Sequence, residues 1–222
     1  VYSIATKLYS PLAGTLDAPD KFVSIAEAGV KKLPRSGHMR NTYAYALMAT
    51  GRFADAGREL DTYAQLVPRE PNPYDSLGEL NLLLGNPARS VEFYSRALTV
   101  DPTFPSRSGR SWALAMLGRY DEAIADHGPG ADVSAFVLSR VGRYREAARD
   151  IEAGMTDADA GGSVVIRTDL HLLSSVFAIE QKDYARARME IAVAEQIVAA
   201  LPEEQRRLHL VAADLLAGIA DA

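Results

Sequence analysis

The chain has 222 residues, 48% of them hydrophobic, so it can bury the core of one large domain or two small ones. Its 24 basic and 29 acidic residues give a net charge of −5, which argues against direct nucleic-acid binding, because that affinity comes mainly from clustered Lys and Arg. The absence of cysteine excludes disulfide frameworks and thiol catalysis. No apolar run approaches the ~20 residues of a membrane span and no leader is visible, so we expect a cytoplasmic protein.

Regularly spaced prolines and glycines indicate an internal repeat. Three prolines recur every 34 residues: Pro34, Pro68 and Pro102. The pattern Gly-Arg-aromatic-x-x-Ala begins at Gly51, Gly118 and Gly142, with a diverged copy at Lys182. Repeats of this length predict a solenoid of stacked units.

Each copy predicts a helix, a tight turn and a second helix. The glycine supplies the positive φ of the turn, and the proline ends the second helix. The residue seven positions before each turn is small, which lets the two helices approach closely. These small residues are Ala44, Gly78, Ser111, Ala135 and Ser175.

In chain order, we expect a helix over residues 1–10 and then a row of repeats. The regular ones are 17–36 (partial), 37–70 and 71–104; the irregular ones are 105–128, 129–160 and 164–200. The short repeat should end at the breaker residues 127–130, and the small residues 154–163 predict a mobile loop. A capping helix is expected over 202–220, with apolar spacing at Leu208, Val211, Leu215 and Leu216.

The best copy resembles the tetratricopeptide repeat. It contains Leu77, Gly78, Gly85, Tyr94, Ala97 and Pro102 at the family's positions, and it departs mildly at three others, with Tyr74 for the usual Trp, Asn81 for Tyr and Ser90 for Ala. The resemblance covers roughly residues 17–200 and implies an all-α, right-handed superhelical solenoid of five to six antiparallel helix pairs, with a C-terminal capping helix.

The resemblance also implies that the first helix of each pair lines a concave face that binds a peptide or partner domain. The residues expected there are Asn41, Tyr45, Met48, Asp75, Glu79, Leu82, Ser108, Trp112, Met116, Phe136 and Arg140. Trp112 and Phe136 lie in repeats that are shorter than 34 residues. Their side chains could therefore face either the groove or the core. If Tyr45 and Trp112 face the groove, their replacement by alanine should weaken binding with little effect on folding.

One subset of the family grips C-terminal carboxylates with Lys at position five and Asn at position nine of the repeat. Here the corresponding pairs are Asn41 with Tyr45, Asp75 with Glu79, and Ser108 with Trp112. The carboxylate clamp is therefore absent. Arg107, Arg110 and Arg140 remain candidates to pair with an acidic partner, although an exposed helix face would have the same sequence.

No pattern in the sequence indicates catalysis, a cofactor or a metal. The four histidines lie too far apart for a helical metal pair, and an apparent calcium loop from Asp157 has Thr168 where glutamate is required. No glycine-rich phosphate loop or nucleophile elbow occurs.

The sequence therefore predicts a non-catalytic protein-interaction module. The alternative is a regulatory or sensor domain, or a helical arm, of a larger bacterial signalling protein or enzyme, because the chain begins at Val1 rather than Met. An uncapped N-terminal repeat would expose an apolar face, which favours homo-oligomerisation.

Overall fold

The computed structural model describes residues 19–127, 132–201 and 203–221. Within these ranges the chain forms twelve helices and no strand, which confirms the expected all-α repeat solenoid. The helix expected over residues 1–10 lies outside the described residues. The helices group into two compact units that divide between Arg119 and Tyr120.

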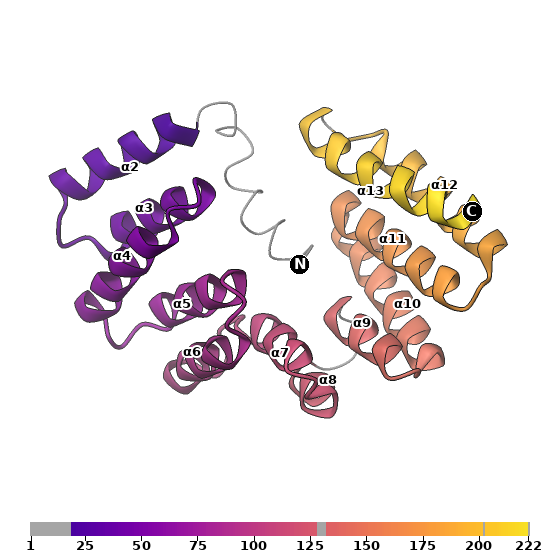
Figure 1. The fold of residues 1–222 in the computed structure, drawn as a ribbon, viewed down its shortest axis with the longest axis horizontal. Coiled ribbons are helices and arrows are strands. Elements are labelled where there is room, and N and C mark those ends of the chain that lie inside the picture. Colours follow the sequence, from indigo (N-terminus) through magenta and orange to yellow (C-terminus); the bar gives the residue numbers. More distant parts are fainter. Residues whose placement is uncertain (1–18, 128–131, 202, 222) are drawn as a thin grey trace. The chain divides into compact units, whose positions relative to one another are not determined.

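Unit 1 contains six helices in which each packs against the next. They are α2 (Pro19–Lys32), α3 (Gly37–Ala49), α4 (Phe53–Leu66), α5 (Asn72–Leu83), α6 (Pro87–Val100) and α7 (Arg107–Met116). The first helices of the pairs, α3, α5 and α7, form one layer, and the second helices α4 and α6 form the other (Figure 1). As predicted, α2, α4 and α6 end two residues before Pro34, Pro68 and Pro102.

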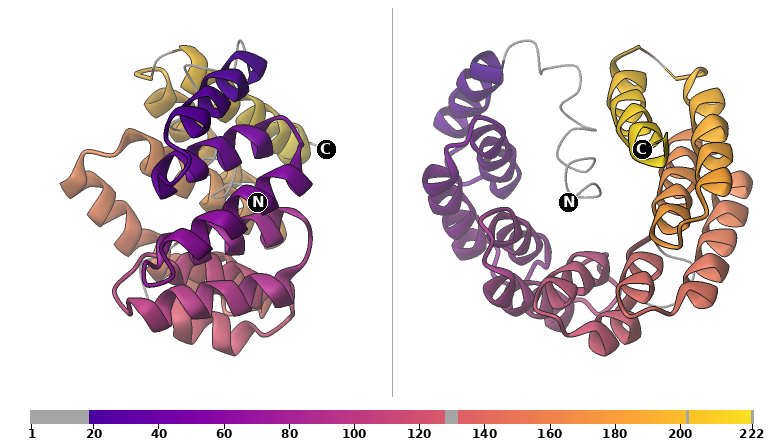
Figure 2. Two further views of the ribbon diagram at one scale, coloured as in Figure 1. Left: turned by 90° about the vertical axis from the view of Figure 1, so that its left-hand side faces the viewer. Right: turned by 45° about the vertical axis from the view of Figure 1, so that its right-hand side comes forward.

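Unit 2 continues the alternation with helices of less regular length. They are α8 (Tyr120–His127), α9 (Asp132–Arg140), α10 (Tyr144–Gly161), α11 (Val164–Glu180), α12 (Tyr184–Val198) and α13 (Glu203–Asp221). The orange and yellow helices α11, α12 and α13 lie side by side, and all three contact one another (Figures 1 and 2). The short α8 ends at His127, where the breaker residues predict it.

The turn residues adopt the backbone conformation that the repeat requires. Gly51, Gly85, Gly118 and Gly142 have φ between 72° and 77°. Lys182 takes the same place in the diverged copy with a φ of 60°, and it is the one non-glycine with positive φ among the described residues. The diverged copy therefore keeps the geometry of the turn without its usual residue.

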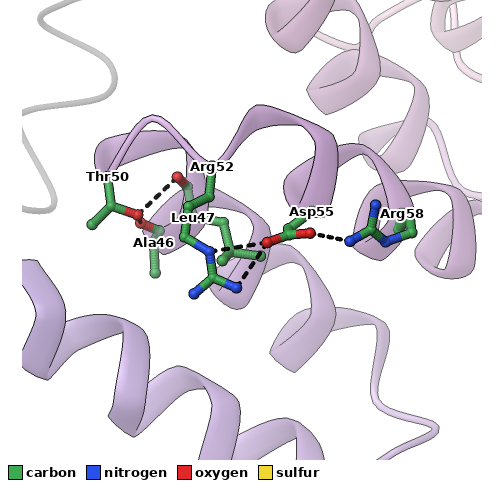
Figure 3. Close-up of polar contacts among 6 residues, drawn as sticks. All are labelled: Ala46, Leu47, Thr50, Arg52, Asp55 and Arg58. Atoms are coloured by element: carbon green, nitrogen blue, oxygen red, sulfur yellow. Dashed lines mark hydrogen bonds and ion pairs between the residues drawn. The ribbon is translucent and has the colours of Figure 1, made fainter.

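The turn after α3 shows how each second helix starts (Figure 3). The Thr50 hydroxyl donates to the Leu47 carbonyl at 3.0 Å, which ends α3. Arg52 donates to the Asp55 carboxylate at 2.7 and 2.9 Å, within the first turn of α4. Arg143, directly before α10, donates to the Glu146 carboxylate in the first turn of α10, with both distances 2.7 Å. The same arginine–carboxylate contact thus occurs in the second unit.

Small residues hold the helix pairs together, as the sequence predicts. Ala44, Ser111, Ala135 and Ser175 are fully buried, and Gly78 is buried with its carbonyl accepting the Ser90 hydroxyl at 2.8 Å. A Cβ atom on Gly78 would lie 2.8 Å from the Tyr94 ring. The same ring would also clash with a Cβ on Gly109 of α7. Tyr94 therefore packs against two first helices at once.

The loop predicted over residues 154–163 is wrong. Residues 154–161 continue α10, which ends at Gly162 in a left-handed conformation. Gly154 and Ala158 are buried on the face that carries Ile151, so the small residues serve close packing rather than flexibility.

The expected C-terminal helix is present as α13, but its packed face differs from the prediction. Val211 and Leu215 are 62% and 66% exposed. The helix packs through Ala213, Ala217 and Ala220, together with Leu216, which the prediction named. Alanines let α13 lie close to α11 and α12, which turns the larger residues outward.

Candidate functional site

The predicted partner-binding residues of unit 1 lie on the adjacent first helices α3, α5 and α7. We call the surface formed by Asn41, Tyr45, Asp75, Ser108, Trp112 and Met116 the first-helix face. Met116 is 52% exposed, and the other five side chains are half-buried. The face therefore offers aromatic, polar and apolar groups to solvent along three helices.

Hydrogen bonds connect the helices beneath this face. The Tyr45 hydroxyl of α3 donates to the Glu79 carboxylate of α5, and Ser76 of α5 donates to Asn41 Oδ1 at 3.0 Å. The Ser106 hydroxyl, directly before α7, donates to Asp75 Oδ1 at 2.5 Å. Each first helix of unit 1 is thus tied to its neighbour by side chains at the face.

Electrostatics keep the Tyr45 hydroxyl in its donor form. Burial raises the pKa of Tyr45 far above its usual value of 10.0, and the negative charge of Glu79 raises it further. The neutral hydroxyl can therefore donate to Glu79 at any physiological pH. A carboxylate that is only 6% exposed depends on such donors, because an unsatisfied buried charge is costly.

Three residues predicted for the binding face are buried. Met48 and Leu82 are 4% and 5% exposed, and Glu79 lies beneath Tyr45. Met48 is buried because it belongs to the hydrophobic core of unit 1, to which α2, α3, α4 and α5 all contribute. Tyr45 also packs against that core, so its replacement by alanine would disturb folding as well as any binding.

In unit 2, Phe136 and Arg140 of α9 interact with each other, and Arg140 also contacts α11. The Arg140 guanidinium lies 5.1 Å from the centre of the Phe136 ring, and it pairs with Glu180 of α11. Arg140 was expected to be available to an acidic partner. The structure instead gives it a carboxylate within the unit, where it joins two first helices.

Sequence reasoning missed the side chains that connect the helices. Ser76 and Ser106 lie outside the repeat positions that we assigned to the face. Asp169 and His209, 3.2 Å apart, join α11 to α13, and His171 and Glu190, 2.7 Å apart, join α11 to α12. A serine or histidine on a helix carries no sequence signal for a partner that lies one helix away.

The described residues contain no cluster of three or more His, Asp or Glu side chains suited to a metal ion. In the same residues no helix has the length and apolarity to cross a membrane.

No family model matches the sequence, and no curated protein matches it. Solved structures do. A tetratricopeptide repeat protein from Parabacteroides merdae is 16% identical over 93% of this chain and 84% of its own, with a TM-score of 0.55. TTC0263, a thermophilic TPR protein of Thermus thermophilus, is 18% identical over 92% of this chain and 96% of its own, with a TM-score of 0.55.

A third match is the APC/C hetero-tetramer Cut9-Hcn1. It is 14% identical over 99% of this chain, with a TM-score of 0.65, and this chain spans 45% of the matched chain. At these identities the likeness is one of fold. The chain has the fold of tetratricopeptide repeat proteins.

Proposed function

Starting from this fold, we propose that the chain is a non-catalytic protein-interaction module whose first-helix face in unit 1 binds a peptide or partner domain. The observation that carries the proposal is the connection of Tyr45 to Glu79 across α3 and α5. It holds a half-buried aromatic ring in place before any partner arrives. A preorganised aromatic side chain loses little conformational freedom on binding and is a frequent anchor at interfaces.

The chemistry of the face favours a partner that combines apolar and polar groups. Trp112 and Met116 supply apolar surface on α7, and Asp75 and Asn41 supply oxygens that accept hydrogen bonds from backbone amides. An extended peptide has both an apolar side-chain pattern and free amides. This combination supports peptide or domain binding over catalysis.

The test uses two exposed methionines as a matched pair. The immobilised chain, Met116→Glu and Met189→Glu are exposed to extract of the source cell, and retained proteins are identified by mass spectrometry. Met116 lies on the first-helix face, whereas Met189 is 59% exposed on α12. A protein retained by the original chain and by Met189→Glu but lost with Met116→Glu supports the proposal. Equal retention by all three, or equal loss in both variants, contradicts it.

A further inference from the structure

A second recessed surface lies on the opposite layer of unit 1, between α4 and α6. It is an open slot of about 360 Å³. Tyr74 and Leu77 of α5 form its floor, and Ala64, Pro68 and Phe93 form its walls. The Tyr74 hydroxyl donates to the Pro68 carbonyl at 3.0 Å, which fixes the floor. We call this surface the outer slot. Its volume suits one or two apolar side chains.

Two arginines of α6 are stacked on aromatic rings along this slot. The Arg96 guanidinium lies 4.1 Å from the centre of the Tyr74 ring, and that of Arg89 lies 5.3 Å from the centre of the Phe93 ring. Stacking uses the face of a guanidinium and leaves its N–H edges directed sideways. Within the part of the chain that the structure describes, neither arginine has a hydrogen bond or an ion pair. Arg96 thus places a donor group at the edge of the slot, and Arg89 lies over Phe93, a residue of the slot's wall.

The wall opposite Arg96 carries hydrogen-bond acceptors instead of a cation. Asp61 and Gln65 of α4 line the slot, and both are exposed. The Asp61 carboxylate repels an anion and attracts an N–H donor. The slot therefore has an apolar floor, with the Arg96 cation on its α6 wall and hydrogen-bond acceptors on its α4 wall.

We propose that the outer slot binds an acidic peptide segment in which leucine or phenylalanine adjoins a glutamate or aspartate. The apolar side chain enters between Pro68 and Phe93, and the carboxylate accepts two hydrogen bonds from the edge of Arg96. Arg89 adds positive charge about two turns before Arg96 in α6. The backbone amides of the segment face Asp61 and Gln65. This site is independent of the first-helix face, because it lies on the other layer of helices.

The probe is the fluorescein-labelled peptide Glu-Glu-Leu-Phe-Glu-Glu, titrated with the full chain and followed by fluorescence anisotropy. Arg96→Gln should weaken binding about tenfold or more, the effect of losing hydrogen bonds to a charged group. Arg145→Gln is the matched control, since Arg145 is exposed on α10 and the substitution changes the net charge equally. Equal affinity of the two variants overturns the proposal, as does a lack of binding to the original chain.

A second peptide tests whether the sign of the peptide's charge matters for binding. The peptide Lys-Lys-Leu-Phe-Lys-Lys keeps the apolar residues and should bind at least tenfold more weakly; equal binding overturns the proposal. Asp61→Asn keeps an oxygen that can accept from the amides of the segment and removes the negative charge, so it should tighten binding of the acidic peptide a few-fold; weaker binding would contradict the assigned polarity.

A third arm separates the two faces of unit 1. Met116→Glu and Met189→Glu add the same charge and should bind the acidic peptide equally. A selective loss with Met116→Glu would assign the peptide to the first-helix face, which overturns the outer slot and leaves the proposed function standing. Loss of the extract partner with Met116→Glu, together with intact peptide binding, is the result expected if both proposals hold.

Discussion

At the scale of single residues, Tyr94 shows how the repeat tolerates a large side chain in its core. The ring is 2% exposed and occupies space that a Cβ atom would need on Gly78 and on Gly109. Only glycine leaves that space at both positions. Two glycines on neighbouring first helices therefore set how closely α5 and α7 approach α6.

We expect Gly78→Ala to lower the free energy of unfolding by about 1–3 kcal/mol, because the new methyl group overpacks against the Tyr94 ring. Urea unfolding followed by circular dichroism measures the change. Gly57→Ala is the matched control: its Cβ would lie 3.5 Å from Leu80, an ordinary contact, and alanine favours the helix by about 0.5–1 kcal/mol. A Gly78→Ala variant as stable as the control would contradict this packing.

At the turn residue Lys182, we expect that introducing a glycine stabilises the protein. A side chain at a φ of 60° is strained by roughly 1–2 kcal/mol. Lys182→Gly removes that strain and adds some freedom to the unfolded chain, so we expect a net gain in stability of about 0.5–1 kcal/mol. Thermal unfolding tests this, with Gly142→Lys expected to change stability in the reverse direction. A destabilising Lys182→Gly would mean that the lysine side chain contributes more than its strain costs.

At the scale of helices, polar pairs join elements that the apolar pattern only brings near one another. In unit 1 these pairs involve serine, asparagine, tyrosine and carboxylates, and in unit 2 they involve Arg140, His171 and His209. Buried polar groups need partners, so each pair favours one register between two helices over the alternatives. The first helices are therefore aligned by side chains as well as by packing.

The pair of His171 on α11 and Glu190 on α12 should make the stability of the fold depend on pH. The hydrogen bond from His171 lowers the pKa of Glu190 below its ordinary value of 4.5. A group with a lowered pKa in the folded state contributes stability above its unfolded pKa, and that stability is lost as the pH falls through the folded value. Stability should therefore decrease below about pH 4.5, and Glu190→Gln should remove part of this decrease.

Chemical unfolding between pH 3 and pH 7 measures the effect. Glu195→Gln is the control, because Glu195 is exposed on the same helix and forms no ion pair within the described ranges. Identical pH profiles for Glu190→Gln and the original chain would show that the pair contributes nothing to stability.

At the scale of the whole molecule, the contacts are mainly between neighbours in the chain. The main contacts of α6 are with α5 and α7, and those of α12 are with α11 and α13. In repeat proteins of this kind, stability is approximately a sum over units and their nearest neighbours. A destabilising substitution should therefore affect mainly its own helix and the neighbouring helices.

Hydrogen exchange tests this on the full chain. Gly78→Ala should reduce amide protection in α5, α6 and α7 and leave α11 and α12 close to their original protection. Ala187→Leu, which overpacks a fully buried position in α12, should do the reverse. Uniform loss of protection in both variants would indicate that the chain unfolds as one cooperative unit.

Much of the fold follows from the sequence by itself. The 34-residue period, the turn residues, the helix ends before proline and the buried small side chains depend on local φ preference and on side-chain size, which each residue carries with it. The all-α class and the arrangement in helix pairs follow from these features. The diverged turn at Lys182 was predictable only from its place in the repeat pattern, because the φ preference of lysine opposes that conformation.

The tertiary structure decided the rest. Whether the small residues 154–161 form a loop or a helix depended on a packing surface for Gly154 and Ala158. Which face of α13 is buried depended on the approach distance to α11 and α12. The bond between Tyr45 and Glu79 and the stacking of Arg96 on Tyr74 join residues 34 and 22 positions apart, on different helices. A repeat pattern specifies which residues face a neighbour, but partners on separate helices meet only once the helices are packed.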